Sequence, residues 1–201
     1  MELLRPFGPS IGRERIPNEI HSSLLQLTDE VLADKNRENI GDKLAGQIKE
    51  QNEVPIKKLI KHNVFTYFME MVDFYYQGIF QGLIHEDDHK GLSTENTMTS
   101  CWVNSMYKHE WNPIHSHSHL LSAIIILKVP KDLKPPEGMI GFANNPCRMP
   151  FELEHGIQVF MPKEQHFYLF PARLNHSVNP FTCDGERRTM SFNIHTNLGE
   201  K

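Results

Sequence analysis

The stretch Arg187-Arg188-Thr189-Met190-Ser191-Phe192-Asn193-Ile194 decides the fold, because polar and apolar residues alternate along it. Successive side chains of a β-strand point to opposite faces, so this period of two predicts a strand. Arg187, Thr189, Ser191 and Asn193 share one face, and the other face is mostly apolar. The apolar face should pack under helices. A polar face inside a β-sandwich indicates an interior that holds a ligand.

The sequence after about residue 96 has the texture of an all-β domain. Short runs rich in β-branched and aromatic residues alternate with proline and glycine, which is typical of strands separated by turns. Seven short strands at this spacing favour a β-sandwich or barrel. The predicted strands cover residues 98–106, 120–129, 138–143, 157–161, 166–170, 175–180 and 187–195.

The sequence before residue 96 has a helical period instead. Residues 1–16 contain Pro6 and Pro9 and predict an extended arm. From Pro17, apolar residues recur at steps of three and four, which predicts an amphipathic helix. Residues 35–53 are polar and indicate a connector, and a long helical stretch begins near Pro55. These helices would cover one outer face of the sheet.

Two histidine elements lie about sixty residues apart. The first is His115-Ser116-His117, and the second is His176 within Leu174-Asn175-His176-Ser177. Residues two apart on a strand lie on one face, roughly 6.5 Å apart, so His115 and His117 can bind one ion while His176 completes the site. Three ligands leave coordination positions open. The pattern therefore predicts a catalytic metal centre rather than a closed structural one.

The remaining histidines receive a simpler interpretation. His119 has the parity of His115 and His117, but three ligands from one strand would span roughly 13 Å, so we place His119 beside the site or at the surface. The run His85-Glu86-Asp87-Asp88-His89 is interpreted as a solvated loop. The others are expected at the surface or at element ends: His62, His109, His155, His166 and His195.

Composition excludes several classes of protein. The chain has 201 residues and a net charge of −4, so no basic surface indicates nucleic-acid binding. It contains no apolar run of about 18 residues that would cross a membrane, and its beginning lacks the core of a signal peptide. The three cysteines are scattered, which favours a reducing compartment. We therefore expect a cytoplasmic location.

Several segments together resemble a known family. They are Trp102-Val103-Asn104, Trp111 to His117, Leu121-Ser122-Ala123, Phe170-Pro171-Ala172, Leu174 to Pro180 and Arg187 to Asn193. Their order and spacing resemble the double-stranded β-helix iron(II)/2-oxoglutarate-dependent oxygenases. The likeness is closest to a family of small oxygenases common in marine bacteria and phages, related to the prolyl 4-hydroxylase-like enzymes. It covers roughly residues 98–195.

The resemblance implies a mostly β fold, with a double-stranded β-helix (jelly-roll) core at 97–201. The arm and supporting helices at 1–96 would pack against it in one structural unit. It implies iron(II) held by His115, His117 and His176, with 2-oxoglutarate chelating the iron. The far carboxylate of 2-oxoglutarate would meet Arg187, whose planar fork suits a carboxylate, and Thr189. Dioxygen would then react to give succinate, carbon dioxide and a hydroxylated substrate.

The chain departs from the family pattern at two places. His117 stands where the broad superfamily has aspartate, a feature the narrower family shares. Ala123 and Ile126 stand near a usual glycine and tyrosine, so one common contact to 2-oxoglutarate is missing. Asn104 and Tyr107 are the candidates to replace it.

Two alternative functions stay open at this point. A cupin-like metalloprotein without 2-oxoglutarate suits three histidines, but a cupin usually has a Glu after its first His pair and none lies between Leu120 and Pro136. A non-enzymatic β-sandwich binding module would not need Arg187 and Thr189. The substrate is an unidentified small molecule or peptide, and the oligomeric state is open. We expect loops 130–138 and 143–156 to line the mouth of the site, with contacts from Asn144, Asn145, Arg148, Glu152 and Glu154.

Overall fold

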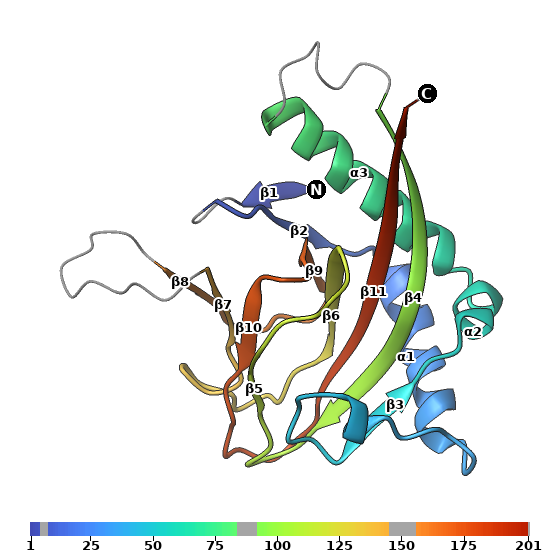
Figure 1. The fold of residues 1–201 in the computed structure, drawn as a ribbon. Helices are drawn as coiled ribbons and strands as arrows, with labels where there is room; N and C mark the ends of the chain where they lie inside the picture. The colour runs from blue at the N-terminus through green and yellow to red at the C-terminus, as the bar shows by residue number, and fades with distance from the viewer. Residues whose placement is uncertain (5–7, 84–91, 145–155, 201) are drawn as a thin grey trace.

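Two antiparallel sheets face each other in the computed structural model, which describes residues 1–4, 8–83, 92–144 and 156–200 (Figure 1). The larger sheet has seven strands in the order β1-β2-β9-β6-β11-β4-β3, and the smaller has four in the order β5-β10-β7-β8. This is the predicted jelly roll. The larger sheet comprises β1 (Glu2–Leu4), β2 (Ile11–Arg15), β9 (His166–Pro171), β6 (Leu121–Lys128), β11 (Arg187–Glu200), β4 (Leu92–Met106) and β3 (Glu50–Glu53). The smaller comprises β5 (Asn112–His115), β10 (Asn175–Val178), β7 (Ile140–Ala143) and β8 (Ile157–Phe160).

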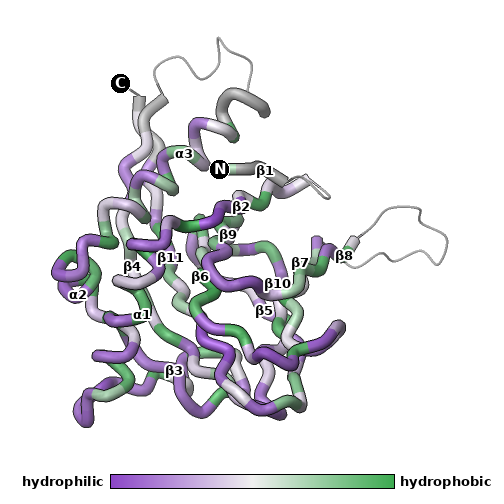
Figure 2. The backbone as a smooth tube through the Cα atoms, turned by 180° about the vertical axis from the view of Figure 1, so that it is seen from behind, coloured by the Kyte–Doolittle hydropathy of each residue, from purple (hydrophilic) through white to green (hydrophobic). Residues whose placement is uncertain are grey.

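The helices cover the outer face of the larger sheet. They are α1 (Asn18–Ala33), α2 (Ile56–Lys61) and α3 (Phe65–Leu83), and a short 3₁₀ turn spans Gly41–Lys43. Phe68 of α3 is fully buried, with its ring 5.0 Å from Phe192 of β11 and 6.2 Å from Phe167 of β9. Figure 2 shows hydrophobic stretches in strands such as β6 and hydrophilic residues at the loops. The predicted role of the helices is therefore confirmed.

The inner face of the larger sheet packs against the smaller sheet. Ile124 and Ile126 of β6 belong to this second core, together with Phe142 of β7 and Tyr168 and Phe170 of β9. Along β6 the neighbouring residues Ile125 and Leu127 instead join the core under the helices. The alternation follows from the two-residue period of a strand buried on both faces.

The N-terminal segments differ from their predicted roles. The arm at 1–16 forms β1 and β2, and β2 pairs with β9, so the arm extends the larger sheet. The connector at 35–53 ends in β3, which pairs with β4. The helical stretch after Pro55 is two helices, because the chain turns at Asn63 with a φ of +57°. These strands depend on distant partners, which no local pattern reveals.

The strand predictions in the second half are confirmed, with two corrections. All seven predicted strands are present, and β4 and β11 extend to Leu92 and Glu200 because they pair with each other along their whole length. The strand β5, which carries His115, was not among the predicted strands. The division at residue 96 stays a prediction, and the larger sheet draws strands from both sides of it.

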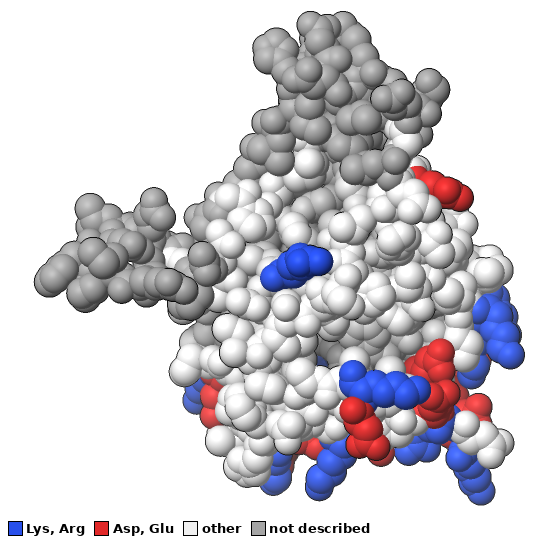
Figure 3. Space-filling model, in the orientation of Figure 1, with Lys and Arg blue, Asp and Glu red and all other residues white. Residues whose placement is uncertain are grey.

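Charged side chains are unevenly distributed on the face seen in Figure 1. Figure 3 shows Lys, Arg, Asp and Glu gathered along the lower edge, near β3 and the turn at β5, while the centre is mostly uncharged. The two signs interleave there, so this face presents no single-sign basic patch among the described residues. None of the described helices is both long and apolar enough to span a membrane.

Candidate active site

Three histidines converge between the two sheets. His115 of β5 and His176 of β10 are directly opposite each other across an antiparallel pair, and their ring centroids lie 4.1 Å apart. His117 follows two residues after the end of β5, where its backbone N–H donates to the carbonyl of Ala172 at 2.8 Å. One ring nitrogen from each histidine lies within 4.8 Å of the others. The structure thus brings the predicted triad together, although His117 lies beyond the end of β5 and does not share a strand with His115 as predicted.

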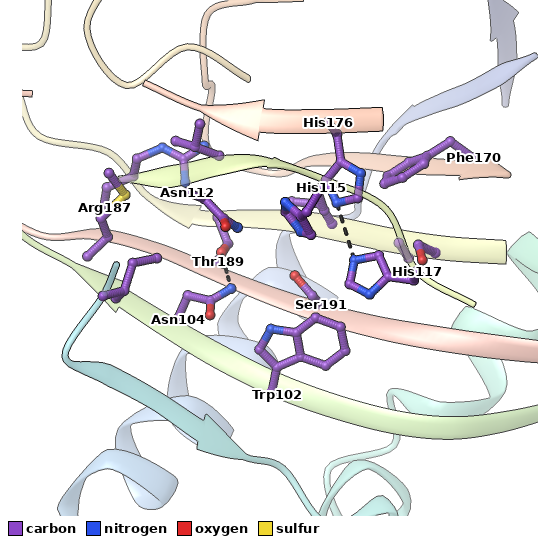
Figure 4. A pocket seen from close by; sticks show the side chains of 16 residues that line it. Trp102, Asn104, Asn112, His115, His117, Phe170, His176, Arg187, Thr189 and Ser191 are labelled. Carbon is purple, nitrogen blue, oxygen red and sulfur yellow. Dashed lines mark hydrogen bonds between the residues drawn. The ribbon is translucent and has the colours of Figure 1, made fainter. Parts of the chain in front are cut away.

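Hydrogen bonds on the far side of two rings orient them toward a common point. The Nδ1 of His115 donates to the carbonyl of Pro113 at 2.8 Å, and the Nδ1 of His176 donates to the carbonyl of Leu174 at 3.0 Å. A carbonyl can only accept, so each proton is on Nδ1 and each Nε2 keeps its lone pair. The Nε2 atoms of His117 and His176 face each other at 3.3 Å (Figure 4).

This arrangement fits a divalent transition metal. Two nitrogens bound at about 2.1 Å and at right angles would lie roughly 3 Å apart, close to the observed separation. Burial, together with the neighbouring imidazoles, lowers the pKa of His117 to about 4 and that of His176 to about 3; burial also lowers the pKa of His115. The rings are therefore neutral near pH 7, the state in which imidazole binds metal.

Arg187 lies at the other end of the same cavity, with one nitrogen of its guanidinium left without a partner. The side chain is 3% exposed, and its Nε donates to the carbonyl of Gly138 at 3.1 Å. Its buried Nη2 has no hydrogen-bond partner, and no carboxylate among the described residues pairs with it. Burial lowers the pKa of Arg187 to about 10. A buried cation without a counter-ion is costly, so this group fits a bound anion.

Other polar side chains lie between the arginine and the histidines. Thr189 and Ser191 follow Arg187 on the inner face of β11, as predicted, and line the cavity with Asn104. The Nδ2 of Asn104 donates to Oγ1 of Thr189 at 3.3 Å (Figure 4). Asn104 therefore lines the same cavity as Arg187, and its role as the replacement contact stays a prediction. Tyr107 is 47% exposed and is not part of the cavity lining.

The remaining predicted residues lie elsewhere. His119 approaches Thr99 rather than the triad, with Nδ1 at 3.4 Å from Oγ1. Asn144 is described but does not line this cavity. The predictions for Asn145, Arg148, Glu152 and Glu154, and for the run at 85–89, lie outside the described residues.

Two residues were not singled out from the sequence. Asn112 lines the cavity and its buried Oδ1 has no partner. Gln51 of β3 lies behind Asn104, and its Nε2 donates to Oδ1 of Asn104 at 2.9 Å. Neither residue carries a local signal, because Gln51 belongs to a polar connector and Asn112 is one amide among many.

Comparisons with known structures agree on the fold. A prolyl hydroxylase from Trichoplax adhaerens, solved with a hypoxia inducible factor peptide, is similar with a TM-score of 0.60 at 13% identity, over 92% of this chain and 83% of that one. HygX from Streptomyces hygroscopicus, with nickel, 2-oxoglutarate and hygromycin B bound, has a TM-score of 0.55 at 9% identity, over 94% and 83%. SnoN, an alpha ketoglutarate dependent epimerase from nogalamycin biosynthesis, has a TM-score of 0.63 at 13% identity, over 95% and 77%.

The sequence comparison points the same way. Among curated proteins no sequence matches this chain. Residues 100–193 match the family model described as "Putative 2OG-Fe(II) oxygenase". That range spans the strand core from β4 to β11 and contains all three histidines, Arg187 and Thr189. The strand core of this chain, with the candidate site that it carries, is therefore similar to the 2OG-Fe(II) oxygenase family.

Proposed function

We propose that this chain hydroxylates an unidentified substrate at an iron(II) ion held by His115, His117 and His176. The far carboxylate of 2-oxoglutarate would bind Arg187 and Thr189, with Asn104 behind them. The observation that carries the proposal is the unpaired Nη2 of Arg187, which lines the same cavity as three neutral imidazoles. An anion with a metal-chelating end some distance from a carboxylate satisfies both ends of that cavity.

The chain's own residues would orient and isolate the reaction. The backbone hydrogen bonds of His115 and His176 fix their tautomers before any metal arrives, so the site is preorganised. Arg187 and Thr189 would set the distance of 2-oxoglutarate from the histidines. Trp102 and Phe170 line the cavity and exclude water beside the reacting atoms.

When bound, iron(II) and 2-oxoglutarate supply the redox chemistry. That chemistry would be the oxidative decarboxylation of 2-oxoglutarate by dioxygen to succinate and carbon dioxide, with the second oxygen atom inserted into a C–H bond of the substrate. Three imidazoles carry no charge, so the negative charge near the metal comes from 2-oxoglutarate itself. Tight metal binding should therefore depend on 2-oxoglutarate more than it does at a site with a carboxylate ligand.

The substrate and the cellular location are defined only as broad classes. The similar structures carry a peptide in one case and hygromycin B in another, so the shared fold does not define a substrate. A small molecule or a peptide remains the proposed class. A reducing, cytoplasmic location stays a prediction that rests on cysteine usage; of the described cysteines, Cys101 and Cys183 are free.

The test is an anaerobic titration of iron(II)-loaded protein with 2-oxoglutarate, followed by the visible charge-transfer band of the chelate. We expect a band in the wild type and in His119→Ala, and no band in His117→Ala. His119 is the matched control, because it lies two residues away but contacts Thr99. Iron binding without a band would favour the cupin-like alternative. No iron binding would favour a binding module.

A further inference from the structure

Gln51, Asn104 and Thr189 form a row across three neighbouring strands. Gln51 of β3 is directly opposite Asn104 of β4, which is directly opposite Thr189 of β11. Residues directly opposite in paired strands point to the same face, here the inner one. All three side chains are buried, with Gln51 only 1% exposed. The row therefore leads from the sheet edge to the cavity that contains Arg187.

The hydrogen bonds along this row share one direction. The Nε2 of Gln51 donates to Oδ1 of Asn104 at 2.9 Å, and the Nδ2 of Asn104 donates to Oγ1 of Thr189 at 3.3 Å. In this arrangement Gln51 donates to the oxygen of Asn104, which leaves the Nδ2 end of Asn104 facing Thr189, while Oε1 of Gln51 has no partner among the described residues. With its oxygen accepting from Gln51, Asn104 presents an N–H to Thr189.

This direction determines what Thr189 can offer to a ligand. A hydroxyl has one proton and two lone pairs, and the bond from Asn104 occupies a lone pair. No other hydrogen bond of this hydroxyl is present among the described residues. The proton of Thr189 is therefore free to be donated into the cavity, where Arg187 also presents an unsatisfied N–H. Two donors side by side match a carboxylate, which only accepts.

Packing holds the Gln51 amide in this position. A Cβ added at Gly46 would lie 2.7 Å from Nε2 and 3.0 Å from Oε1 of Gln51, so the backbone of the connector lies directly against the amide. The backbone carbonyl of Gln51 accepts from the N–H of Ile40 at 2.7 Å, which ties β3 to the segment before it. The connector around Gly46 and Ile40 thus packs against the outer end of this row and limits the movement of Gln51.

We infer that Gln51 is a positioning residue for 2-oxoglutarate, which acts through Asn104 to keep Thr189 a donor to the far carboxylate. The inference rests on the proposed function. It assigns to the N-terminal half a part in cofactor selectivity, because β3 lies outside the segment that carries the histidines and Arg187.

The test compares two ligands that share the chelating end. 2-Oxopentanoate has the keto acid of 2-oxoglutarate but no far carboxylate, so the ratio of their dissociation constants reports on the Arg187 end alone. Dissociation constants would be measured by calorimetry on anaerobic protein loaded with manganese(II). We expect Gln51→Met to lower the preference for 2-oxoglutarate on the order of tenfold, the effect of weakening one hydrogen bond to a charged group. Binding of 2-oxopentanoate should not change.

A double-mutant cycle separates positioning from mere packing. In a Thr189→Val background the hydroxyl is gone, so Gln51→Met should have no further effect on the preference. A packing role for Gln51 would weaken both ligands equally and would persist in the Thr189→Val background, which overturns the inference. A wild type that does not prefer 2-oxoglutarate would instead overturn the proposed function.

Gln51→Glu provides a second variant if Gln51→Met folds poorly. Its carboxyl group donates to Asn104 only when protonated, and when ionised it accepts and reverses the row. The preference for 2-oxoglutarate should therefore fall more steeply with rising pH in Gln51→Glu than in the wild type. Parallel pH profiles for the two proteins would overturn the inference.

Discussion

The two faces of β11 carry adjacent arginines in opposite situations. Arg188 points toward the helices, where it donates to both carboxylate oxygens of Glu186 at 2.6 and 3.0 Å and to Thr28 and Asp29 of α1. Arg187 points toward the histidines and leaves Nη2 without a partner. Both are at least 95% buried. Burial alone therefore does not mark a functional arginine; an unsatisfied donor inside a ligand-sized cavity does.

The same contrast continues along the strand. Met190, Phe192 and Ile194 complete the core under the helices, while Thr189 and Ser191 line the cavity. Side chains on the outer face of β11 pack against other residues of the protein. Polar side chains on the inner face line the cavity, where they can bind a ligand. Substitutions on the outer face should therefore change stability, and substitutions on the inner face should change ligand binding. The following predictions test this division, from the largest effect to the smallest.

His176→Ala should abolish iron-dependent turnover and leave the fold intact. The ring faces the cavity, and its removal takes away one of three metal ligands. Turnover can be followed as succinate formation, and folding by the thermal midpoint with and without added metal. His119→Ala is the control and should keep its activity. Loss of folding in His176→Ala would indicate a structural metal instead.

Arg187→Ala should raise the KM for 2-oxoglutarate by roughly a hundredfold or more, because a buried carboxylate loses its charged partner. Iron content and the free energy of unfolding should change little, since the arginine has no counter-ion in the protein. Steady-state kinetics and metal analysis measure these quantities. An unchanged KM would show that another residue binds the far carboxylate of 2-oxoglutarate.

Arg188→Ala should do the reverse. It removes the partner of the part-buried Glu186 and bonds to Thr28 and Asp29, so we expect a loss of about 3 kcal/mol in the free energy of unfolding. The KM for 2-oxoglutarate should stay within about twofold of the wild type. Urea denaturation and kinetics on the same preparation test both statements. A KM that changes well beyond twofold while the free energy of unfolding stays unchanged would contradict the division between the faces.

The pH dependence of stability should also report on the outer face. Burial raises the pKa of Glu186, but hydrogen bonds from Arg188, Ser105 and Lys128 outweigh it and lower the pKa overall. A carboxyl whose folded pKa is lowered stabilises the protein above its unfolded value of about 4.3 and loses that contribution as pH falls through the folded pKa. Glu186→Gln should therefore be less stable than the wild type at pH 7, with the difference shrinking below pH 4. Denaturation at several pH values measures it, and a constant difference would contradict the assignment.

The sequence predicted much of the candidate site because its signals are local. The alternation from Arg187 to Ile194 assigned each residue to its face, and the spacing of His115, His117 and His176 indicated one metal centre. The alternation follows from the period of an extended chain, which does not depend on what surrounds it. The triad depended on residue type and on the family resemblance as well, because His117 lies beyond the end of β5 and His176 comes from β10.

Other features were decided by tertiary structure. The arm at 1–16 and the connector before Glu53 became strands of the larger sheet because β9 and β4 offered them hydrogen bonds.

By itself, then, the sequence determined most of the strand core, the faces of residues 187–194 in β11 and which three histidines form the triad. Only the tertiary structure decided that Arg188 finds Glu186 and α1 while Arg187 keeps a free donor, and that Gln51 stands behind Thr189. The physical reason is range: a two-residue period acts between neighbours in the chain, whereas hydrogen-bond partners here are up to 160 residues apart.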